Sequence, residues 1–293
     1  MHKSGFVNII GNPNVGKSTL MNALVGERLS IITQKAQTTR HRIMGIVSGE
    51  EFQIVYSDTP GILKPAYKLQ ESMMKFVRGA LTDADVILYV TDTVEQGDRS
   101  AEIIDDIRRS GIPTVVVINK IDLSTPEALE ALVERWQAEL PAARIVPVSA
   151  KERFNVEGVF KTVLELLPEG PAFYPKETLT DKTLRFFASE IIREKILRFY
   201  DKEIPYCCQI EIDSYKEEPS IDRIAATIYV ARDSQKGILI GHKGEKLKRV
   251  GQAAREDMEA FLGKKVFLQL FVKVSDDWRN DERQLRRFGY EQE

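Results

Sequence analysis

The sequence predicts an α/β protein in which a doubly wound and mostly parallel sheet is followed by a smaller α+β domain. Up to residue 170, short apolar runs alternate with helical patterns, which is typical of a parallel sheet with helices on both faces. After a stretch rich in proline and glycine, the predicted order changes to helix, strand, strand, helix, helix, strand. We therefore expect domains at 1–170 and 183–293, joined by a linker at 171–182.

The first domain is expected to contain six strands and five helices. The predicted strands span residues 6–10, 42–47, 52–57, 86–91, 114–119 and 144–148. The predicted helices span residues 17–24, 70–80, 100–109, 127–139 and 156–166. A turn at 48–51 joins the second and third strands, so we expect a hairpin and one antiparallel edge strand. In such a sheet the ligand binds at the carboxyl ends of the strands.

Residues 11–18 read Gly-Asn-Pro-Asn-Val-Gly-Lys-Ser and match the phosphate-loop pattern G-x-x-x-x-G-K-[ST]. They lie between a predicted strand and a predicted helix, which is the structural context that supports the match. In such a loop the backbone N–H groups face the phosphates, the lysine reaches the β and γ oxygens, and the hydroxyl binds Mg²⁺. The predicted phosphate-binding residues are Gly11, Asn14, Val15, Gly16, Lys17, Ser18, Thr19 and Gly61.

A second motif, Asn-Lys-Ile-Asp at 119–122, predicts that the base is guanine. Asp122 can accept hydrogen bonds from N1–H and the 2-amino group of guanine, whereas adenine would leave the carboxylate unpaired. A polar site of this kind discriminates by roughly 10⁴-fold or more. An ordinary strand-to-helix turn is the alternative, but it does not explain the position of the motif after Asp58. The predicted guanine-binding residues are Asn119, Lys120, Asp122, Ser149, Ala150 and Lys151.

Two further segments, Thr38-Thr39 and residues 58–61 (Asp-Thr-Pro-Gly), complete the pattern of a nucleotide-dependent switch. We expect Ser18, Thr39 and Asp58 to hold Mg²⁺, with Thr38 as the alternative to Thr39. Both threonines also fit the description of simple polar loop residues. Loss of the γ-phosphate should release the loops at 31–42 and 62–78. The predicted switch residues are Thr38, Thr39, Arg40 and Ile62.

In the second domain, Gly-His-Lys-Gly at 241–244 lies at the turn between two predicted helices. A G-x-x-G turn in this order of elements is typical of type II KH domains, which bind RNA. The glycines let phosphates approach the backbone, and the following helix N-terminus favours an anion. The alternatives are a helix-turn-helix that only packs and a dimerisation module. The predicted RNA-binding residues are Gly241, His242, Lys243, Gly244, Lys246, Lys248 and Arg249.

Composition gives no global attraction to a polyanion, because the formal net charge is -2 and the pI is near 6.1. The two cysteines, Cys207 and Cys208, are adjacent, which suits neither a structural disulfide nor a zinc site. No signal peptide and no apolar run of ~20 residues is found, so a cytoplasmic location is expected. The stretch 181–200 is amphipathic, and it fits either packing in the second core or peripheral attachment to the inner membrane.

Together these motifs resemble the Era family of bacterial Ras-like GTPases, which carry a C-terminal KH domain. The stretches 35–42 (Lys-Ala-Gln-Thr-Thr-Arg-His-Arg) and 281–283 (Asp-Glu-Arg) also carry the resemblance, which covers almost the whole chain. It implies that GTP is hydrolysed to GDP and phosphate with Mg²⁺, and that the KH domain binds 16S ribosomal RNA near its 3′ end. It also implies a role in maturing the 30S ribosomal subunit, and no stable oligomer is expected. The alternative is a GTP-dependent regulatory switch that acts on a protein or at the inner membrane.

Catalysis is the least complete part of the pattern. Ras-like enzymes orient the attacking water with a glutamine that directly follows the glycine of the Asp-x-x-Gly segment. Here that glycine is Gly61, and the next residue is Ile62. Isoleucine cannot hydrogen-bond, so we expect slow intrinsic hydrolysis. In related GTPases with Pro-Asn in the phosphate loop, the asparagine helps to bind K⁺, which makes Asn14 a candidate K⁺ ligand. Arg40 and Arg42 are an alternative source of positive charge, although they also fit solvated loop residues.

Overall fold

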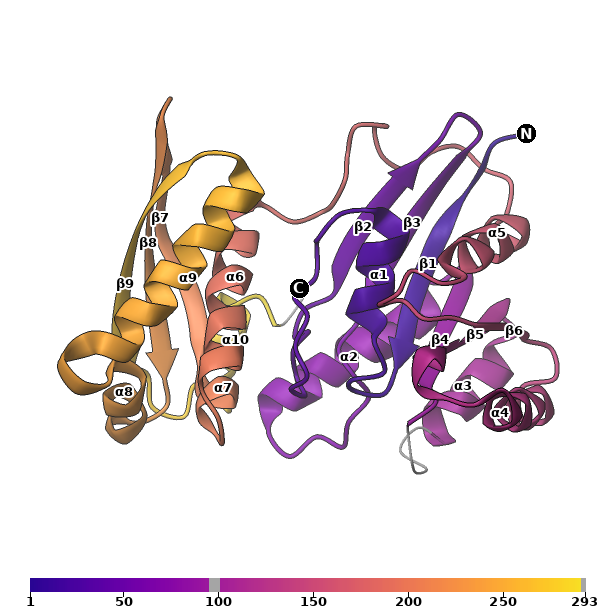
Figure 1. Cartoon of the computed structure of the whole chain (residues 1–293), viewed down its shortest axis with the longest axis horizontal. Coiled ribbons are helices and arrows are strands. Elements are labelled where there is room, and N and C mark those ends of the chain that lie inside the picture. The colour runs from indigo at the N-terminus through magenta and orange to yellow at the C-terminus, as the bar shows by residue number, and fades with distance from the viewer. Residues whose placement is uncertain (95–100, 291–293) are drawn as a thin grey trace. The chain divides into compact units, whose positions relative to one another are not determined.

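The computed structural model describes residues 1–94 and 101–290. The chain forms two compact units, one made of residues 1–65 and 73–181 and the other of residues 66–72 and 182–293 (Figure 1). The first unit contains a six-stranded sheet of order β2-β3-β1-β4-β5-β6, and the second a three-stranded sheet of order β7-β8-β9. The predicted fold class is therefore confirmed.

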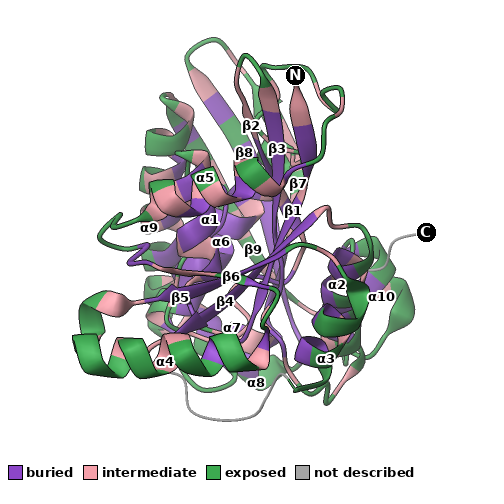
Figure 2. Ribbon diagram, turned by 90° about the vertical axis from the view of Figure 1, so that its right-hand side faces the viewer, coloured by how far each residue is buried: buried purple, intermediate pink, exposed green. Residues whose placement is uncertain are grey.

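The first sheet is parallel except at one edge. Its strands are β1 (Lys3–Gly11), β2 (Ile43–Ser48), β3 (Phe52–Asp58), β4 (Val86–Asp92), β5 (Thr114–Asn119) and β6 (Arg144–Pro147). The pair β2 and β3 forms the predicted antiparallel hairpin. Every residue of β4 and β5 is buried, as expected for central strands with helices on both faces (Figure 2).

The helices of this sheet agree closely with the sequence pattern. They are α1 (Lys17–Val25), α2 (Lys68–Thr82), α3 (Ala101–Ser110), α4 (Pro126–Glu139) and α5 (Val156–Leu166), with a short 3₁₀ helix η1 (Ile121–Leu123). Helix α1 ends at Gly26, whose φ of 85° is in the left-handed region that glycine adopts without strain. Helix α4 begins after Thr125, whose side chain accepts a hydrogen bond from the Ala128 N–H. The predicted helix at 100–109 begins at Ser100, which lies outside the described residues.

The segment predicted as a linker, 171–182, is bonded to the open edge of the first sheet. The Ile46 N–H donates to the Leu179 carbonyl at 2.8 Å, and the Met44 N–H donates to Asp181 Oδ1 at 3.0 Å. Backbone groups of the edge strand are thereby satisfied by the chain itself. Residues up to Asp181 consequently belong to the first unit.

The second unit packs α6, α8 and α9 on one face of its sheet (Figure 1), whereas the C-terminal segment contacts Tyr229 on the other face. Its strands are β7 (Gln209–Glu217), β8 (Ile221–Val230) and β9 (Lys265–Val274). Its helices are α6 (Leu184–Phe199), α7 (Ile204–Cys207), α8 (Asp233–Ile240), η2 (His242–Gly244), α9 (Glu245–Leu262) and α10 (Glu282–Arg287). Strand β7 is antiparallel to β8, and β8 is parallel to β9.

Helix α6 supplies its apolar stripe to this second core. Ile191, Ile192 and Ile196 all lie in the cluster that α8, α9 and the sheet complete. The amphipathic pattern of 181–200 is therefore accounted for by packing. Among the helices of residues 1–94 and 101–290, none is long and apolar enough to cross a membrane.

The segment after β9 closes the second unit in a way that the sequence pattern does not predict. Trp278 is fully buried and donates from Nε1 to the Cys207 carbonyl at 2.9 Å. The Tyr290 hydroxyl donates to Gln209 Oε1 at 2.7 Å. Between them, Asp281 caps α10 by accepting from the backbone of its first turn. Both cysteines are buried free thiols.

Candidate nucleotide and RNA sites

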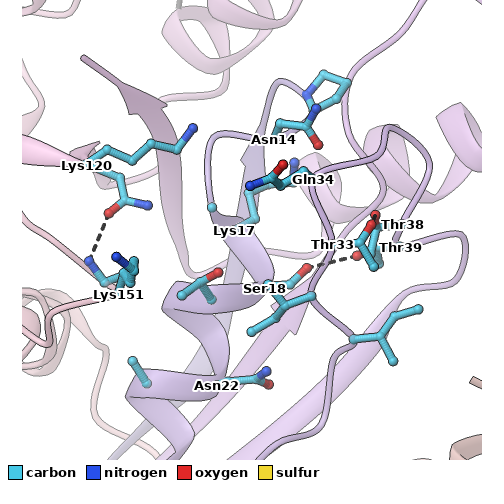
Figure 3. A pocket seen from close by; sticks show the side chains of 18 of the residues that line it. Asn14, Lys17, Ser18, Asn22, Thr33, Gln34, Thr38, Thr39, Lys120 and Lys151 are labelled. Carbon is cyan, nitrogen blue, oxygen red and sulfur yellow. Dashed lines mark hydrogen bonds between the residues drawn. The ribbon is translucent and has the colours of Figure 1, made fainter. Parts of the chain in front are cut away.

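A cavity of about 1100 Å³ opens at the carboxyl ends of the first sheet (Figure 3). It brings together most of the residues predicted to bind phosphate, guanine and metal. Those that line it are Asn14, Gly16, Lys17, Ser18, Thr19, Thr38, Thr39, Gly61, Asn119, Lys120, Asp122, Ser149, Ala150 and Lys151. Gly11, Val15, Arg40, Asp58 and Ile62 are not among its lining residues.

The phosphate loop turns through two residues with left-handed backbone conformation. Asn14 has a φ of 66° and Gly16 a φ of 93°. A Cβ on Gly16 would lie 2.2 Å from Asn119 Nδ2, so this position requires glycine for space as well as for conformation. The Lys17 ammonium donates to the carbonyls of Gly11 and Asn12 at 3.0 and 2.8 Å. Gly11 thus acts through its backbone, and the lysine lies folded along the loop.

Asn119 joins the phosphate loop to the base-binding loops. Its Nδ2 donates to the Val15 carbonyl at 2.8 Å, and its Oδ1 accepts from the Ala150 N–H at 3.0 Å. The N–H of Ala150, which was predicted to bind guanine, therefore already donates to Asn119. The Ser149 hydroxyl donates to Asp122 Oδ1 at 2.5 Å and orients the carboxylate that is predicted to read the base.

Two residues that the sequence did not single out hold Lys120. The Lys120 ammonium forms an ion pair with Asp92 at 2.5 Å, and the Lys120 carbonyl accepts from Thr93 Oγ1 at 2.9 Å. Lys120 itself has a left-handed φ of 61°. Asp92 ends β4 and Thr93 follows it, so their position at the carboxyl end of a central strand was the signal that could have identified them.

The three residues predicted to hold Mg²⁺ lie within hydrogen-bond distance of one another. Ser18 Oγ is 2.7 Å from Asp58 Oδ2 and 2.9 Å from Thr39 Oγ1, and Thr39 Oγ1 is 3.2 Å from Asp58 Oδ2. Asp58 is fully buried, and its Oδ1 has no hydrogen-bond partner among the described residues. Burial raises the pKa of Asp58, although Lys17 opposes the shift. Buried hydroxyl and carboxylate oxygens with an unused acceptor fit a Mg²⁺ ion.

Thr38 faces away from this group of oxygens. Its hydroxyl donates to the Lys35 carbonyl at 2.6 Å and lies 2.6 Å from Thr33 Oγ1 (Figure 3). The geometry therefore favours Thr39 over the alternative that the sequence left open.

Ile62, Arg40 and Arg42 all pack inside the first unit. Ile62 is 4% exposed and belongs to the core beneath α2 and α3. Arg40 is fully buried. The Arg42 guanidinium forms an ion pair with Asp83 and donates to Asn8 Oδ1 at 3.0 Å. The interpretation of both arginines as solvated loop residues is wrong, and neither lines the cavity.

In the second unit, the G-x-x-G turn has the backbone that its glycines allow. Gly241, Lys243 and Gly244 have φ values of 74°, 48° and 81°. The side chains of His242 and Lys243 are exposed on the turn, and those of Lys246, Lys248 and Arg249 are exposed on the first turns of α9. A Cβ on Gly244 would meet no atom of the residues that the structure describes within 4 Å, so this part of the turn is open to an approaching phosphate.

Two aromatic residues at the end of α6 lie beside these basic groups. The Arg249 guanidinium carbon is 4.4 Å from the Phe199 ring centre, and the Lys246 ammonium is 6.0 Å from the Tyr200 ring centre. The Tyr200 hydroxyl donates to the Leu239 carbonyl at 2.6 Å, and burial raises its pKa to about 12. Sequence reasoning missed both aromatics, because it treated α6 only as an amphipathic helix.

Comparisons with known proteins match both units. A family model described as 50S ribosome-binding GTPase matches residues 6–120, and a KH-domain model matches residues 203–279. The GTPase Era of Alkaliphilus metalliredigens is 45% identical over 295 residues, which covers 99% of both chains. This chain belongs to the Era family. The GTPase Era of Staphylococcus haemolyticus is also 45% identical, over 99% of this chain and 97% of that one.

Two solved Era structures share the whole fold. A crystal structure of Era in complex with MgGDPNP and nucleotides 1506-1542 of 16S ribosomal RNA has a TM-score of 0.96 and 40% identity, and covers 100% of both chains. A variant of Aquifex aeolicus Era bound to GDP.AlF4- has a TM-score of 0.95 and 40% identity, and covers 99% of this chain and 100% of that one. The chain is therefore a GTPase with a C-terminal KH domain, as the resemblance implied.

Proposed function

We propose that this Era-family GTPase binds 16S ribosomal RNA near its 3′ end and assists maturation of the 30S subunit. The observation that supports the proposal is the open G-x-x-G turn with five exposed basic or imidazole side chains beside it, in a chain whose overall charge is slightly negative. Local positive charge on an acidic protein indicates a defined polyanion site. The Era relative solved with nucleotides 1506-1542 of 16S ribosomal RNA identifies the class of RNA.

The nucleotide lies, in this proposal, in the cavity of the first unit. Lys17 binds the β and γ phosphates, the Gly61 N–H contacts the γ-phosphate, and Asp122 reads guanine beside the stem of Lys120. Ser18, Thr39 and Asp58 hold Mg²⁺, which neutralises charge on the phosphates. Because Thr39 belongs to the loop 31–42, its bond to this group links that loop to the state of the nucleotide. GTP and GDP then differ in how firmly the loop is held.

We further propose that K⁺ bound with the help of Asn14 supplies the positive charge that an arginine finger supplies elsewhere. Asn14 is exposed at the cavity, whereas Ile62, Arg40 and Arg42 are packed away from it. The test compares GTP hydrolysis in KCl and in NaCl at equal ionic strength, for the native chain and for Asn14→Ala. Equal rates of the native chain in both salts would refute this proposal.

The ribosomal function is tested by RNA binding of the full chain with a GTP analogue, with GDP and without nucleotide. The probes are a 16S 3′-end fragment and a scrambled fragment of the same length. Changing both His242 and Lys243 to Asp should abolish selective binding, because two acids would face the phosphates. A control that changes Arg109 and Arg135 to Asp places comparable negative charge on the first unit and should bind normally.

The same experiment addresses the alternative of a regulatory switch at a protein or at the inner membrane. That alternative would be favoured if RNA affinity were the same for both RNA sequences and for every nucleotide state, and if the chain also associated with anionic liposomes. Helix α6 gives little support to attachment at the inner membrane, because the apolar stripe of this helix is packed in the core of the second unit.

A further inference from the structure

Strand β9 presents a row of alternating aromatic and polar side chains on the face of its sheet opposite the core helices. Val266, Leu268, Leu270 and Val272 turn toward the core, so the intervening side chains point to the opposite face. These are Lys265, Phe267, Gln269, Phe271 and Lys273, which we call the β9 row. All five are exposed, and the two phenylalanines are exposed to 43% and 50%.

The neighbouring strand adds a further cation to this face. Arg223 of β8 lies directly opposite Phe267 in the parallel register, and its guanidinium carbon is 5.4 Å from the ring centre. Thr227 is the residue opposite Phe271. Strand β9 itself carries no acidic residue. The β9 row and Arg223 together therefore combine two accessible rings with three cationic side chains. Two of these cations are paired with acids: Lys265 lies 3.4 Å from Glu259, and Arg223 lies 3.1 Å from Glu218.

Acidic groups on the same face are already engaged. Asp213 accepts from the Thr227 hydroxyl at 2.7 Å, Glu218 accepts from Arg223 Nε at 3.1 Å, and Glu211 pairs with Arg287 of α10. The C-terminal segment covers part of the face, where the Phe288 ring lies 5.5 Å from that of Tyr229. The two phenylalanines of the β9 row remain exposed beyond this covered part.

We propose that the β9 row stacks the bases of a single-stranded RNA segment, as a second RNA contact besides the G-x-x-G turn. Aromatic side chains on an open sheet stack bases of any sequence, and neighbouring Lys and Arg neutralise the phosphates. Phe267 and Phe271 are four residues apart, which is about 13 Å along a strand. A stretch of a few nucleotides spans this distance, with one base on each ring.

The inference rests on the proposed binding of ribosomal RNA and extends it. A G-x-x-G turn contacts about four nucleotides, so a longer RNA has flanking nucleotides left over for a second surface. The RNA in the solved Era relative spans nucleotides 1506-1542, which is well beyond that length.

The chemistry of the β9 row favours RNA over a protein partner. Protein interfaces are depleted in lysine at their centre, whereas lysines flank both rings here. Lysines on an exposed edge strand also oppose the addition of a strand from a second copy of the chain. The charge of the β9 row and the spacing of its two rings therefore both favour single-stranded RNA as the ligand.

The experiment measures affinity of the full chain, with a GTP analogue, for RNA fragments of increasing length from the 16S 3′ end. Changing Phe267 and Phe271 to Ala should weaken binding of the long fragments, by roughly 5- to 150-fold for each ring lost. Binding of a fragment of about four nucleotides at the G-x-x-G turn should stay within twofold of the native chain. Circular dichroism melting of each variant confirms that both units remain folded.

Two further measurements separate base stacking from a general apolar contact. Fluorescence of 2-aminopurine placed along the RNA should be quenched by the native chain and not by the double variant. Phe271→Tyr should retain the affinity for long RNA, whereas Phe271→Leu should lose it. Full affinity with leucine, or no quenching at any position, would overturn the inference.

Other outcomes identify which proposal fails. If the native chain binds none of the fragments, the proposed ribosomal function fails. If the native chain binds and the Phe267 and Phe271 double variant binds equally well at every length, only the β9 inference fails. Concentration-dependent self-association that the double variant abolishes would assign the row to a second copy of the chain and would also overturn it.

Discussion

Replacing Asn119 with alanine should loosen the nucleotide site at both ends, because this one side chain joins the phosphate loop to the base loop. The change removes the bonds to the Val15 carbonyl and the Ala150 N–H. Asn119 is 3% exposed, so water cannot easily replace both bonds. A net hydrogen bond contributes about 1 kcal/mol, and a buried group left unpaired costs about 1–3 kcal/mol. We therefore expect a total loss of about 2–4 kcal/mol.

This loss should divide between the stability of the nucleotide-free protein and its affinity for GDP. If all of it appeared in binding, the dissociation constant would rise roughly 30- to 1,000-fold. Denaturant unfolding without nucleotide measures the first share, and equilibrium binding of a fluorescent GDP measures the second. Gln137→Ala is a matched control, because its exposed side chain donates to the Pro141 carbonyl at 3.1 Å. The control should change either quantity by less than about 1 kcal/mol.

A double-mutant cycle of Asn119 with Gly16 tests directly whether the phosphate loop and the base loop are linked. Because a Cβ at Gly16 would lie 2.2 Å from Asn119 Nδ2, Gly16→Ala should be far more damaging in the native background than in the N119A background. Strictly additive effects, or a GDP affinity of N119A within threefold of the native value, would refute the proposed link between the two loops.

Three other predictions follow from the same unit. Thr39→Ala should weaken Mg²⁺-dependent binding of a GTP analogue at least tenfold more than Thr38→Ala, since only Thr39 contacts the buried carboxylate; equal effects in a titration with and without Mg²⁺ would contradict this. Asp58 has a raised pKa in the folded protein, so without Mg²⁺ and nucleotide its contribution to stability should be lost as pH rises from the acid range toward neutrality. Asp58→Asn should therefore raise the free energy of unfolding at neutral pH and flatten its pH dependence, and a less stable variant would show that burial is not the dominant effect. Arg42→Ala should cost about 2 kcal/mol in denaturant unfolding, because it removes charge-assisted bonds to Asp83. Asp83→Ala should cost less in the R42A background than in the native one, because only the bond from Asn8 Nδ2 then remains to be lost.

The nucleotide motifs could be predicted from sequence because their function depends on local backbone shape. The phosphate loop that contains Gly16 and Lys17 is short, and the spacing of its glycines and lysine is nearly sufficient to place the phosphates. Strands β4 and β5 are mostly apolar in sequence and fully buried, as central parallel strands require. Element type, order and most boundaries in the first unit follow from these two kinds of pattern.

Partners that are distant in sequence could not be predicted in the same way. Nothing near Arg42 in the sequence identifies Asp83 as its ion-pair partner, so a half-buried, paired arginine resembled a solvated one. The choice between Thr38 and Thr39 depends on one backbone turn, which sends one hydroxyl to Asp58 and the other back to Lys35.

The C-terminal segment and the β9 row illustrate a second reason. Trp278 is isolated among polar residues in the sequence, and its burial depends on where the chain returns after β9. For the β9 row, alternation predicts a strand with two different faces, but only the assembled unit shows which face the helices leave exposed.

The bonding of residues 171–181 to the edge of β2 determines how the first unit can be isolated. A sheet edge with unpaired N–H and C=O groups is a template for pairing with another chain. A fragment that ends at Pro168 would remove the Leu179 carbonyl and Asp181 from this edge, and we expect it to self-associate. A fragment that continues to Asp181 would keep the edge covered. The proline-rich stretch that looks like a place to cut the chain is therefore part of what covers the edge of this sheet.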